Sequence, residues 1–319
     1  MSGGGTSWGG GGGSSGSGSG EGGEIDPSQV ILDQTPAEQR SEYEAEINNY
    51  LEDVIRDFSQ RDTEKIGTHL ETLRQALEKD IENPIELRYG GSIKKHTYID
   101  GMSDVDAIFT INGTGLESKT PREVIHELAN KIRDRLPYTQ LKEGEMAVTT
   151  KFTDGTEVQV LPAIRTSTGI RVASIGGQKW SNVANPDKFA KRLTSLNQQT
   201  AGKLVRVIRL FKAEVNSQLT GGWQMSGYHV EALAVDAFSN YEGRTTYKDM
   251  LVHLTRHASD SVLSPLRDST GQSIHVDDDL GESNSNDRKI VSAALQRVLS
   301  KMNDADSRAS MKRWTELMG

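Results

Sequence analysis

The sequence contains no cysteine, so disulfide bonds and thiolate-bound metal sites are excluded. No apolar run approaches the length of about 20 residues that a helix needs to cross a membrane. The N-terminus also has no basic segment followed by an apolar core, which is the pattern of a secretory signal. We therefore expect a cytoplasmic protein that has no membrane partner.

Basic residues are also fewer than acidic ones. The chain has 37 Lys and Arg residues against 45 Asp and Glu, which gives a formal net charge of −8 over 319 residues. This balance argues against an extended surface for duplex nucleic acid, which would need a broad basic face. A small nucleotide that is bound through a metal ion needs no such surface.

Composition and periodicity divide the chain into three parts. Residues 1–24 are almost entirely Gly and Ser, which cannot bury a core, so we expect a disordered tail. Residues 25–180 alternate between helical and strand-like patterns, which predicts an α/β lobe with a mixed, twisted sheet. Residues 181–319 have helical periodicity and predict a C-terminal helical lobe.

Local signals predict most of the individual elements. Helices are expected at 36–59 and 62–77, the second of them packing behind the strand at 107–111. Thr35 and Thr120 each precede a proline and lie three residues before a glutamate, which is a helix-start signal. The other expected strands lie at 85–89, 146–152 and 156–164, and the other expected helices at 187–197, 202–218, 228–240, 247–257, 287–302 and 306–318.

One stretch carries the strongest chemical signal. Gly90, Gly91 and Ser92 form a glycine-rich turn, and Asp104 and Asp106 follow at the start of an apolar strand. Side chains at i and i+2 of a strand point to one face, so the two carboxylates project together. Oxygen ligands of this kind suit Mg²⁺, and the turn offers N–H groups and a hydroxyl to phosphates. Each half alone is a common turn or strand end, but the combination predicts nucleotidyl transfer.

Two later segments offer further site residues. Glu157 and Gln159 lie on one face of the strand at 156–164, from which a third carboxylate for a two-metal centre would come. Taken alone, the pattern is that of a half-exposed strand. Arg209 and Lys212 lie three apart on the helix at 202–218, where they would clamp the phosphates of a triphosphate. A solvated basic face accounts for their spacing equally well.

These motifs together resemble those of polymerase-β-like nucleotidyltransferases. Within that family, the chain resembles the branch that contains the oligoadenylate synthetases, cyclic GMP-AMP synthase and the bacterial CD-NTases of CBASS-type anti-phage signalling. The family pattern of Gly-Ser, Asp-x-Asp and a later acidic strand ending in Leu-Pro-Ala is matched by Gly91 and Ser92, by Asp104 and Asp106, and by residues 157–163. The helix at 204–212 resembles the one that grips the donor triphosphate, and Tyr228 matches the tyrosine near the base.

The resemblance implies a two-metal site and reveals one departure from the family. Asp104 and Asp106 are expected to hold two Mg²⁺ or Mn²⁺ ions that activate the nucleophile and steady the leaving group. The third aspartate of the family would stand at Gln159, whose amide can ligate but brings no charge. Our hypothesis is that Glu157, two residues earlier on the same face, takes over this role as catalytic carboxylate and metal ligand.

The resemblance further implies an enzyme that joins nucleoside triphosphates into a cyclic or linear oligonucleotide second messenger with release of pyrophosphate. A separate effector protein would read the product during phage infection. The alternatives are a nucleotide-binding pseudoenzyme, which Gln159 favours, and a transferase that nucleotidylates RNA or protein. An interaction module without magnesium-dependent nucleotide binding is the remaining class, and the clustered phosphate and metal signals disfavour it.

Overall fold

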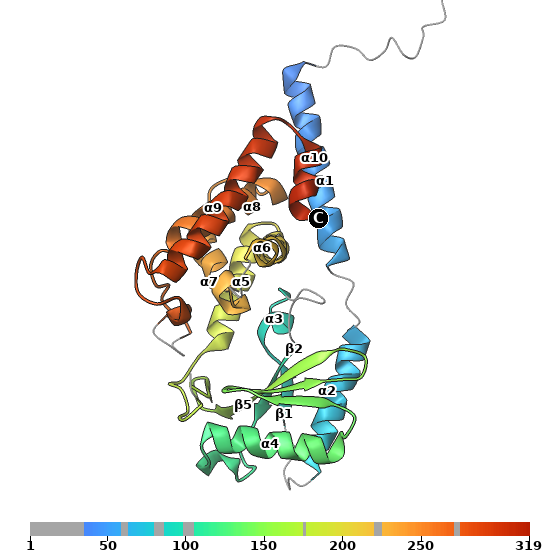
Figure 1. Cartoon of the computed structure of the whole chain (residues 1–319), viewed down its shortest axis with the longest axis vertical. Helices are drawn as coiled ribbons and strands as arrows, with labels where there is room; N and C mark the ends of the chain where they lie inside the picture. Colours follow the sequence, from blue (N-terminus) through green and yellow to red (C-terminus); the bar gives the residue numbers. More distant parts are fainter. Residues whose placement is uncertain are drawn as a thin grey trace, which may run out of the picture. The chain divides into compact units, whose positions relative to one another are not determined.

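A computed structural model describes residues 35–58, 63–79, 86–97, 105–174, 177–219, 225–270 and 275–319 (Figure 1). The chain divides into two units, residues 1–41 and residues 42–319. The described part of the first unit is the start of helix α1 (Pro36–Asp57). There the Thr35 hydroxyl accepts a hydrogen bond from the N–H of Glu38 at 3.3 Å, and the Glu38 carboxylate accepts one from the N–H of Thr35 at 2.8 Å. This reciprocal cap confirms the predicted helix start.

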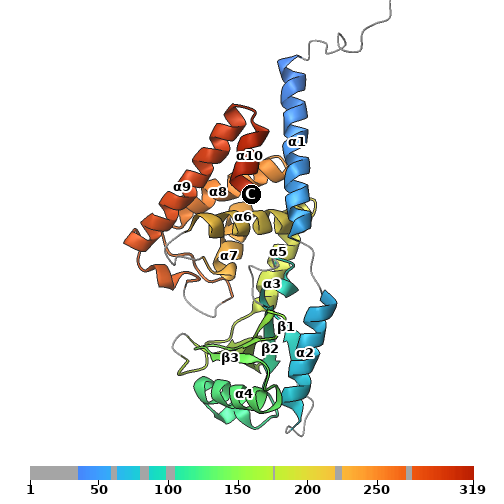
Figure 2. The ribbon, with the colours of Figure 1, turned by 45° about the vertical axis from the view of Figure 1, so that its right-hand side comes forward.

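The second unit combines a mixed sheet with a group of helices (Figures 1 and 2). The elements from α2 to β6 are α2 (Thr63–Glu78), β1 (Glu86–Tyr89), α3 (Gly91–Lys94), β2 (Val105–Thr110), η2 (Leu116–Ser118), α4 (Pro121–Arg135), β3 (Gln140–Glu143), β4 (Val148–Lys151), β5 (Glu157–Arg165) and β6 (Ile170–Val172). The elements that follow are α5 (Pro186–Gln199), α6 (Leu204–Gln218), α7 (Gly227–Phe238), α8 (Tyr247–Ser261), η3 (Asp278–Leu280), α9 (Asn286–Ser307) and α10 (Met311–Met318).

The six described strands pair in the order β1-β2-β5-β4-β3, and β6 pairs with β5. Strands β2 and β5 run parallel, whereas the other pairs are antiparallel. The parallel pair needs a long crossover, and the chain supplies it with α4 and the β3–β4 hairpin between the two strands. The predicted mixed sheet is therefore confirmed.

One face of this sheet is buried against α2 and α4. Strand β2 alternates strictly between buried and half-buried residues, with Val105, Ala107 and Phe109 pointing into the core. They pack with Val158 and Val160 of β5 and with the apolar stripes of α2 and α4. The predicted role of α2 behind this strand is confirmed, and Asp106, Ile108 and Thr110 lie on the opposite face of β2.

Helices α5 to α10 surround a second apolar core, to which the part of α1 in the second unit also belongs. The predicted stripe of α1 is buried there together with residues of α6, α8, α9 and α10. Its members are Tyr43, Ile47, Leu51 and Ile55. The sequence boundary at residue 180 assigned α1 to the catalytic lobe, whereas the packing joins it to the helical part. Periodicity shows which face of a helix is apolar but not which core receives it.

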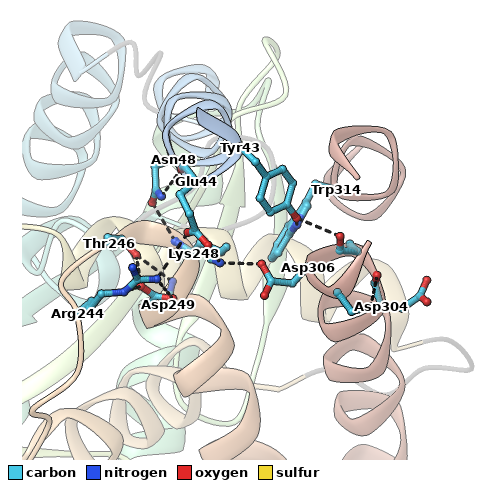
Figure 3. Close-up of polar contacts among 12 residues, drawn as sticks. Tyr43, Glu44, Asn48, Arg244, Thr246, Lys248, Asp249, Asp304, Asp306 and Trp314 are labelled. Atoms are coloured by element: carbon cyan, nitrogen blue, oxygen red, sulfur yellow. Dashed lines mark hydrogen bonds and ion pairs between the residues drawn. The ribbon is translucent and has the colours of Figure 1, made fainter. Parts of the chain in front are cut away.

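Polar groups anchor α1 to α8, α9 and α10 (Figure 3). The buried ammonium of Lys248 lies 2.5 Å from Glu44 Oε1 and 2.7 Å from Asp306 Oδ1. The Tyr43 hydroxyl donates to the Ala305 carbonyl at 3.0 Å and accepts from Trp314 Nε1 at 3.0 Å. A buried charge is tolerated only when it is paired, so Lys248 must meet Glu44 and Asp306. This requirement fixes where residues 43–57 of α1 pack, in addition to their apolar contacts.

The structure differs from the sequence expectations at several boundaries. Strands β3 and β6 were not predicted, and the Gly-Ser turn is a single helical turn, α3. Helix α9 extends to Ser307, and α10 begins at Met311. Ala309 between them has a φ of 45°, a left-handed conformation that ends the helix without glycine. The predicted hairpin turn at Asp154 and Gly155 is confirmed, since Phe152 N–H donates to Thr156 O at 2.9 Å.

Candidate active site

Asp106 lies on the polar face of the sheet, next to a glutamine from the parallel strand. On β2 it is half-buried and points away from the core that receives Val105 and Ala107. The register of the parallel pair places Asp106 directly beside Gln159 of β5. Paired residues of neighbouring strands are about 5 Å apart and share a face. The carboxylate and the amide therefore present oxygen atoms side by side.

The glycine-rich turn is packed onto this carboxylate. The N–H of Gly90 donates to the Asp106 carbonyl at 2.8 Å, which extends the β1–β2 pairing to the turn. Gly91 has a φ of +45°, and a Cβ atom there would lie 1.5 Å from Asp106 Oδ2. Any side chain at this position would collide with the carboxylate, so glycine is required. Ser92, which follows, is buried in α3.

Glu157 occupies a different environment from Gln159. Its Oε1 atom lies 2.7 Å from the ammonium of Lys151 on β4, and its side chain is 38% exposed. Asp104 lies outside the described residues. Within the described parts of the chain, no group of three or more His, Cys, Asp or Glu side chains is arranged to hold a metal ion. The residue that stands beside Asp106 is thus Gln159, and the role of Glu157 as third carboxylate stays a prediction.

Arg209 and Lys212 of α6 hold the main chain that follows the turn. Arg209 donates to the carbonyl of His96 from Nε at 2.9 Å and from a terminal nitrogen at 2.6 Å. Lys212 donates to the carbonyl of Thr97 at 3.2 Å. Both side chains are buried. This arrangement makes them supports of the segment at residues 95–97, so their predicted role as a triphosphate clamp gains no support from their contacts.

A buried ionic cluster ties the same segment to α7. Glu231 is 1% exposed and pairs with Lys212 at 3.0 Å and with Lys95, and its Oε1 atom also accepts from the Thr97 hydroxyl. Burial raises the pKa of Glu231, but the ammonium groups of Lys212 and Lys95 outweigh it, so the pKa lies below its ordinary value. Burial lowers the pKa of Lys212, and Glu231 opposes that change.

Tyr228 forms an aromatic wall with Phe189 of α5. The two rings are 5.0 Å apart with an edge-to-face angle of 71°. The Tyr228 hydroxyl donates to Asp268 Oδ1 at 2.6 Å, and Asp268 also accepts from the N–H and the hydroxyl of Thr270 at 2.8 and 2.7 Å. Burial and the bond to Asp268 raise the pKa of Tyr228, so the phenol stays protonated and its ring is held in one orientation.

A cavity of about 270 Å³ joins the sheet face to this aromatic wall. Its walls are mostly apolar with a few convergent polar groups, as in many ligand-binding cavities. Its lining includes Gly91, Lys95, Asp106, Phe189, Tyr228 and Thr270. A glycine, a carboxylate and an aromatic ring thus converge on one space.

Lys95 is the cation of this cavity, and the sequence interpretation missed it. Its ammonium lies 5.3 Å from the Phe189 ring centroid and 5.5 Å from that of Tyr228, and its side chain is 14% exposed. A cation at this distance from two aromatic faces is electrostatically stabilised. Its position three residues after Ser92, directly after the single helical turn, was the available signal.

The structure therefore sorts the predicted residues into groups. Gly91, Asp106 and Tyr228 line the cavity, and Gln159 is paired with Asp106. The others lie outside the lining: Ser92, Glu157, Arg209 and Lys212.

Comparisons with known proteins give a matching family model and similar solved structures. Residues 43–197 match the model of the Second Messenger Oligonucleotide or Dinucleotide Synthetase domain. A search of curated proteins finds no significant match. Along the described parts of the chain, no helix combines the length and the apolarity needed to cross a membrane.

Several solved structures share the fold. The Bradyrhizobium diazoefficiens CD-NTase CdnG in complex with GTP is similar with a TM-score of 0.66 and 13% identity, over 85% of this chain and 94% of that chain. The Escherichia coli MS115-1 CdnC:HORMA-deltaN complex gives 0.62 and 14%, over 80% and 90%. Vibrio cholerae DncV cyclic AMP-GMP synthase gives 0.58 and 14%, over 91% and 93%. At such low identity these similarities show the fold.

Proposed function

We propose that the chain is a polymerase-β-like nucleotidyltransferase of the CD-NTase type that synthesises an oligonucleotide second messenger, and its fold and its family match over residues 43–197 support this. The single observation that carries this proposal is the packing of the Asp106 carboxylate onto Gly91 in the cavity that Tyr228 closes. This arrangement brings a carboxylate that can ligate a metal ion, a glycine-rich turn and an aromatic ring together around one cavity.

In the proposed reaction a ribose hydroxyl attacks the α-phosphorus of a nucleoside triphosphate. A new phosphate ester bond forms, the bond to the bridging oxygen of the β-phosphate breaks, and pyrophosphate leaves. The hydroxyl loses its proton in the process. The product, cyclic or linear, would be read by a separate effector protein in anti-phage defence, and the triphosphates that related structures bind, such as GTP in CdnG, are the expected substrates.

The residues present fit a magnesium or manganese ion. Asp106 and Gln159 offer oxygen atoms as metal ligands, and these hard cations prefer oxygen ligands. Asp104, expected from the sequence to be the second carboxylate, would complete the set, with Glu157 as the proposed third. A bound divalent ion would supply charge for the phosphate oxygens and acidify the attacking hydroxyl.

The residues of the chain itself supply binding and orientation. Gly91 lets the Asp106 carboxylate pack onto the turn, where any side chain would collide with it. Tyr228, fixed by Asp268, offers one face for stacking of the base. Lys95 offers a positive charge to the phosphates from the same cavity.

The test is incubation of the purified chain with labelled nucleoside triphosphates and Mg²⁺ or Mn²⁺, followed by phosphatase treatment and chromatography, with pyrophosphate measured in parallel. Asp106→Asn should make at least about a hundredfold less product, because loss of even an outer partner of a metal ligand costs 10–100-fold. Asp134→Asn, an exposed substitution of the same kind on α4, is the matched control and should keep full activity.

Each outcome identifies a different function. A product that resists phosphatase is cyclic, and a sensitive oligomer is linear. Label that enters RNA or protein would show a nucleotidylating transferase instead. Triphosphate binding with no pyrophosphate release would favour a pseudoenzyme, the second candidate, which the uncharged Gln159 beside Asp106 supports. Equal activity of Asp106→Asn and Asp134→Asn would overturn the assigned site.

A further inference from the structure

The connection between α8 and α9 contacts two consecutive residues at the start of α7. The Tyr228 hydroxyl donates to Asp268 Oδ1 at 2.6 Å, and the Nε2 atom of His229 lies 3.5 Å from Asp277 Oδ2. Thr270, on the same connection, lines the cavity together with Tyr228. The connection therefore forms part of the cavity wall, and α7 meets it at two points.

Arg288 of α9 ties this connection together behind the cavity. The side chains of Arg288 and Asp277 are both fully buried. Arg288 donates to Asp277 Oδ2 at 2.6 Å and to the Asp277 carbonyl at 3.0 Å. It also donates to three other main-chain carbonyls, those of Val262, Ser264 and Gly281. Because arginine stays protonated, the negative charge of Asp277 is already neutralised without any contribution from His229.

His229 is a buried histidine with an unsatisfied ring nitrogen. It is 2% exposed, and among the described residues its Nε2 atom has no hydrogen-bond partner, since 3.5 Å to Asp277 is too long for a good hydrogen bond. The charged groups that act on the ring are Asp277, Asp279 and Arg288. Burial lowers the pKa of His229 below its ordinary value of 6.5 and outweighs the two aspartates, which raise it, and Arg288 lowers it further. The ring is therefore neutral above that value.

We propose that His229 is a positioning residue for nucleotide binding, and that it makes the affinity of the cavity for a nucleoside triphosphate sensitive to acid. The inference rests on the proposed function, since it takes a nucleotide as the ligand of the cavity. A proton on Nε2 places a second cation beside Asp277, whose Oδ2 atom already holds Arg288. A buried charge without a partner of its own is unfavourable. This unfavourable charge is relieved when the connection moves away from α7 and water reaches the ring.

Such a movement reaches the nucleotide through Asp268. Leu266, two residues earlier, is bound to the segment around Asp277 from both sides. Its N–H donates to Asp277 Oδ1 at 2.9 Å, and its carbonyl accepts from the N–H of Val276 at 2.9 Å. A shift at Asp277 is therefore passed to Asp268 and on to Tyr228, the ring on which the base is proposed to stack. Coupling is reciprocal, so a nucleotide that holds this ring in place makes protonation of the histidine harder.

The first experiment is calorimetric titration of the full chain with the α,β-methylene analogues of ATP and GTP, which cannot release pyrophosphate. It is run with Mg²⁺ at about pH 7.5 and about pH 5.5, on either side of the ordinary histidine pKa. His229→Gln keeps a donor but cannot take up a proton. His126→Gln, an exposed position on α4, is the matched control.

Acid should weaken binding through His229 alone among these two histidines. From the higher to the lower pH, Kd should rise about tenfold more in wild type and in His126→Gln than in His229→Gln, near the lower end of the range of about 5–150-fold that is typical of couplings. Glu214, whose pKa burial raises to about 7, titrates in this range as well. It is present in all of these chains, so it cannot account for a difference between them.

The second experiment follows the histidine rings of the wild-type chain by nuclear magnetic resonance, with and without the bound analogue. The pKa of His229 should fall when the analogue binds, whereas the titration curve of His126 should stay the same. A histidine that only supports the fold would not respond to the ligand. Thermal unfolding at both pH values shows whether each variant is folded, and if His229→Gln is not, the resonance titration alone decides.

The outcomes separate this inference from the proposed function. If neither analogue binds at either pH, the cavity is not a nucleotide site, and both the proposed function and the role of His229 are overturned. If an analogue binds but the Kd of folded His229→Gln depends on pH as that of wild type does, only the role of His229 is overturned. The same conclusion follows if His229 titrates identically with and without the analogue.

Discussion

Replacement of Glu231 by glutamine should destabilise the fold by about 3 kcal/mol, because breaking a buried ion pair by removal of one partner typically costs 3–5 kcal/mol. The carboxylate neutralises two ammonium groups, those of Lys212 and Lys95, and accepts the Thr97 hydroxyl. Glutamine keeps the shape and an oxygen acceptor but leaves two cations without their counter-charge. Lys95 is near the cavity and regains some solvation, so the loss should lie at the lower end of that range.

The loss should also depend on pH in a defined direction. The pKa of Glu231 is lower in the folded chain than its ordinary value of 4.5. A depressed acid pKa contributes stability above the unfolded value, and this contribution is lost as pH falls through the folded value. The difference between wild type and Glu231→Gln should therefore be complete at pH 7 and shrink progressively below about pH 4.5.

Thermal unfolding followed by circular dichroism provides the assay. At about 2–4 °C per kcal/mol for a protein of this size, the midpoint at pH 7 should fall by about 6–12 °C. Glu242→Gln, an exposed position in the loop after α7, removes the same charge and should leave the midpoint within about 1 °C. The reasoning is refuted if Glu231→Gln and Glu242→Gln unfold at the same temperature at pH 7.

Two further predictions concern other groups of the helical part. Tyr228→Ala should raise the KM for nucleoside triphosphate about tenfold, because one stacked base is worth about 1–3 kcal/mol. The KM of Tyr228→Phe should stay within about threefold of the wild-type value. If steady-state kinetics show the same rise in KM for both variants, a stacking role is contradicted. Burial raises the pKa of Glu214 on α6 to about 7, and a raised acid pKa gives stability that is present below pH 4.5 and lost as pH rises towards 7. Glu214→Gln should hence be more stable than wild type by about 2 kcal/mol at pH 8 but not at pH 4.5, and an equal difference in urea unfolding at both pH values would show that charge is not the cause.

Much of the local structure and part of the site follow from the sequence. The apolar period of α1 and the caps at Thr35 and Thr120 predict helices close to where they occur. The alternation of β2 places Asp106 on the face opposite Val105 and Ala107, and the glycine-rich turn packs onto its carboxylate at Gly91. These features are encoded within a few residues, since side-chain period and backbone sterics are properties of short segments.

Tertiary structure alone decided which charged groups neutralise one another and which are left to face the cavity. The parallel pairing of β2 with β5 placed Gln159, and not Glu157, beside Asp106. The packing of α6 against residues 95–97 turned Arg209 and Lys212 inward and left Lys95 as the cation of the cavity. The sequence shows that a side chain is basic, and the spacing shows which face of the helix it lies on. Its partner comes from a distant part of the chain, and burial without that partner would be too costly.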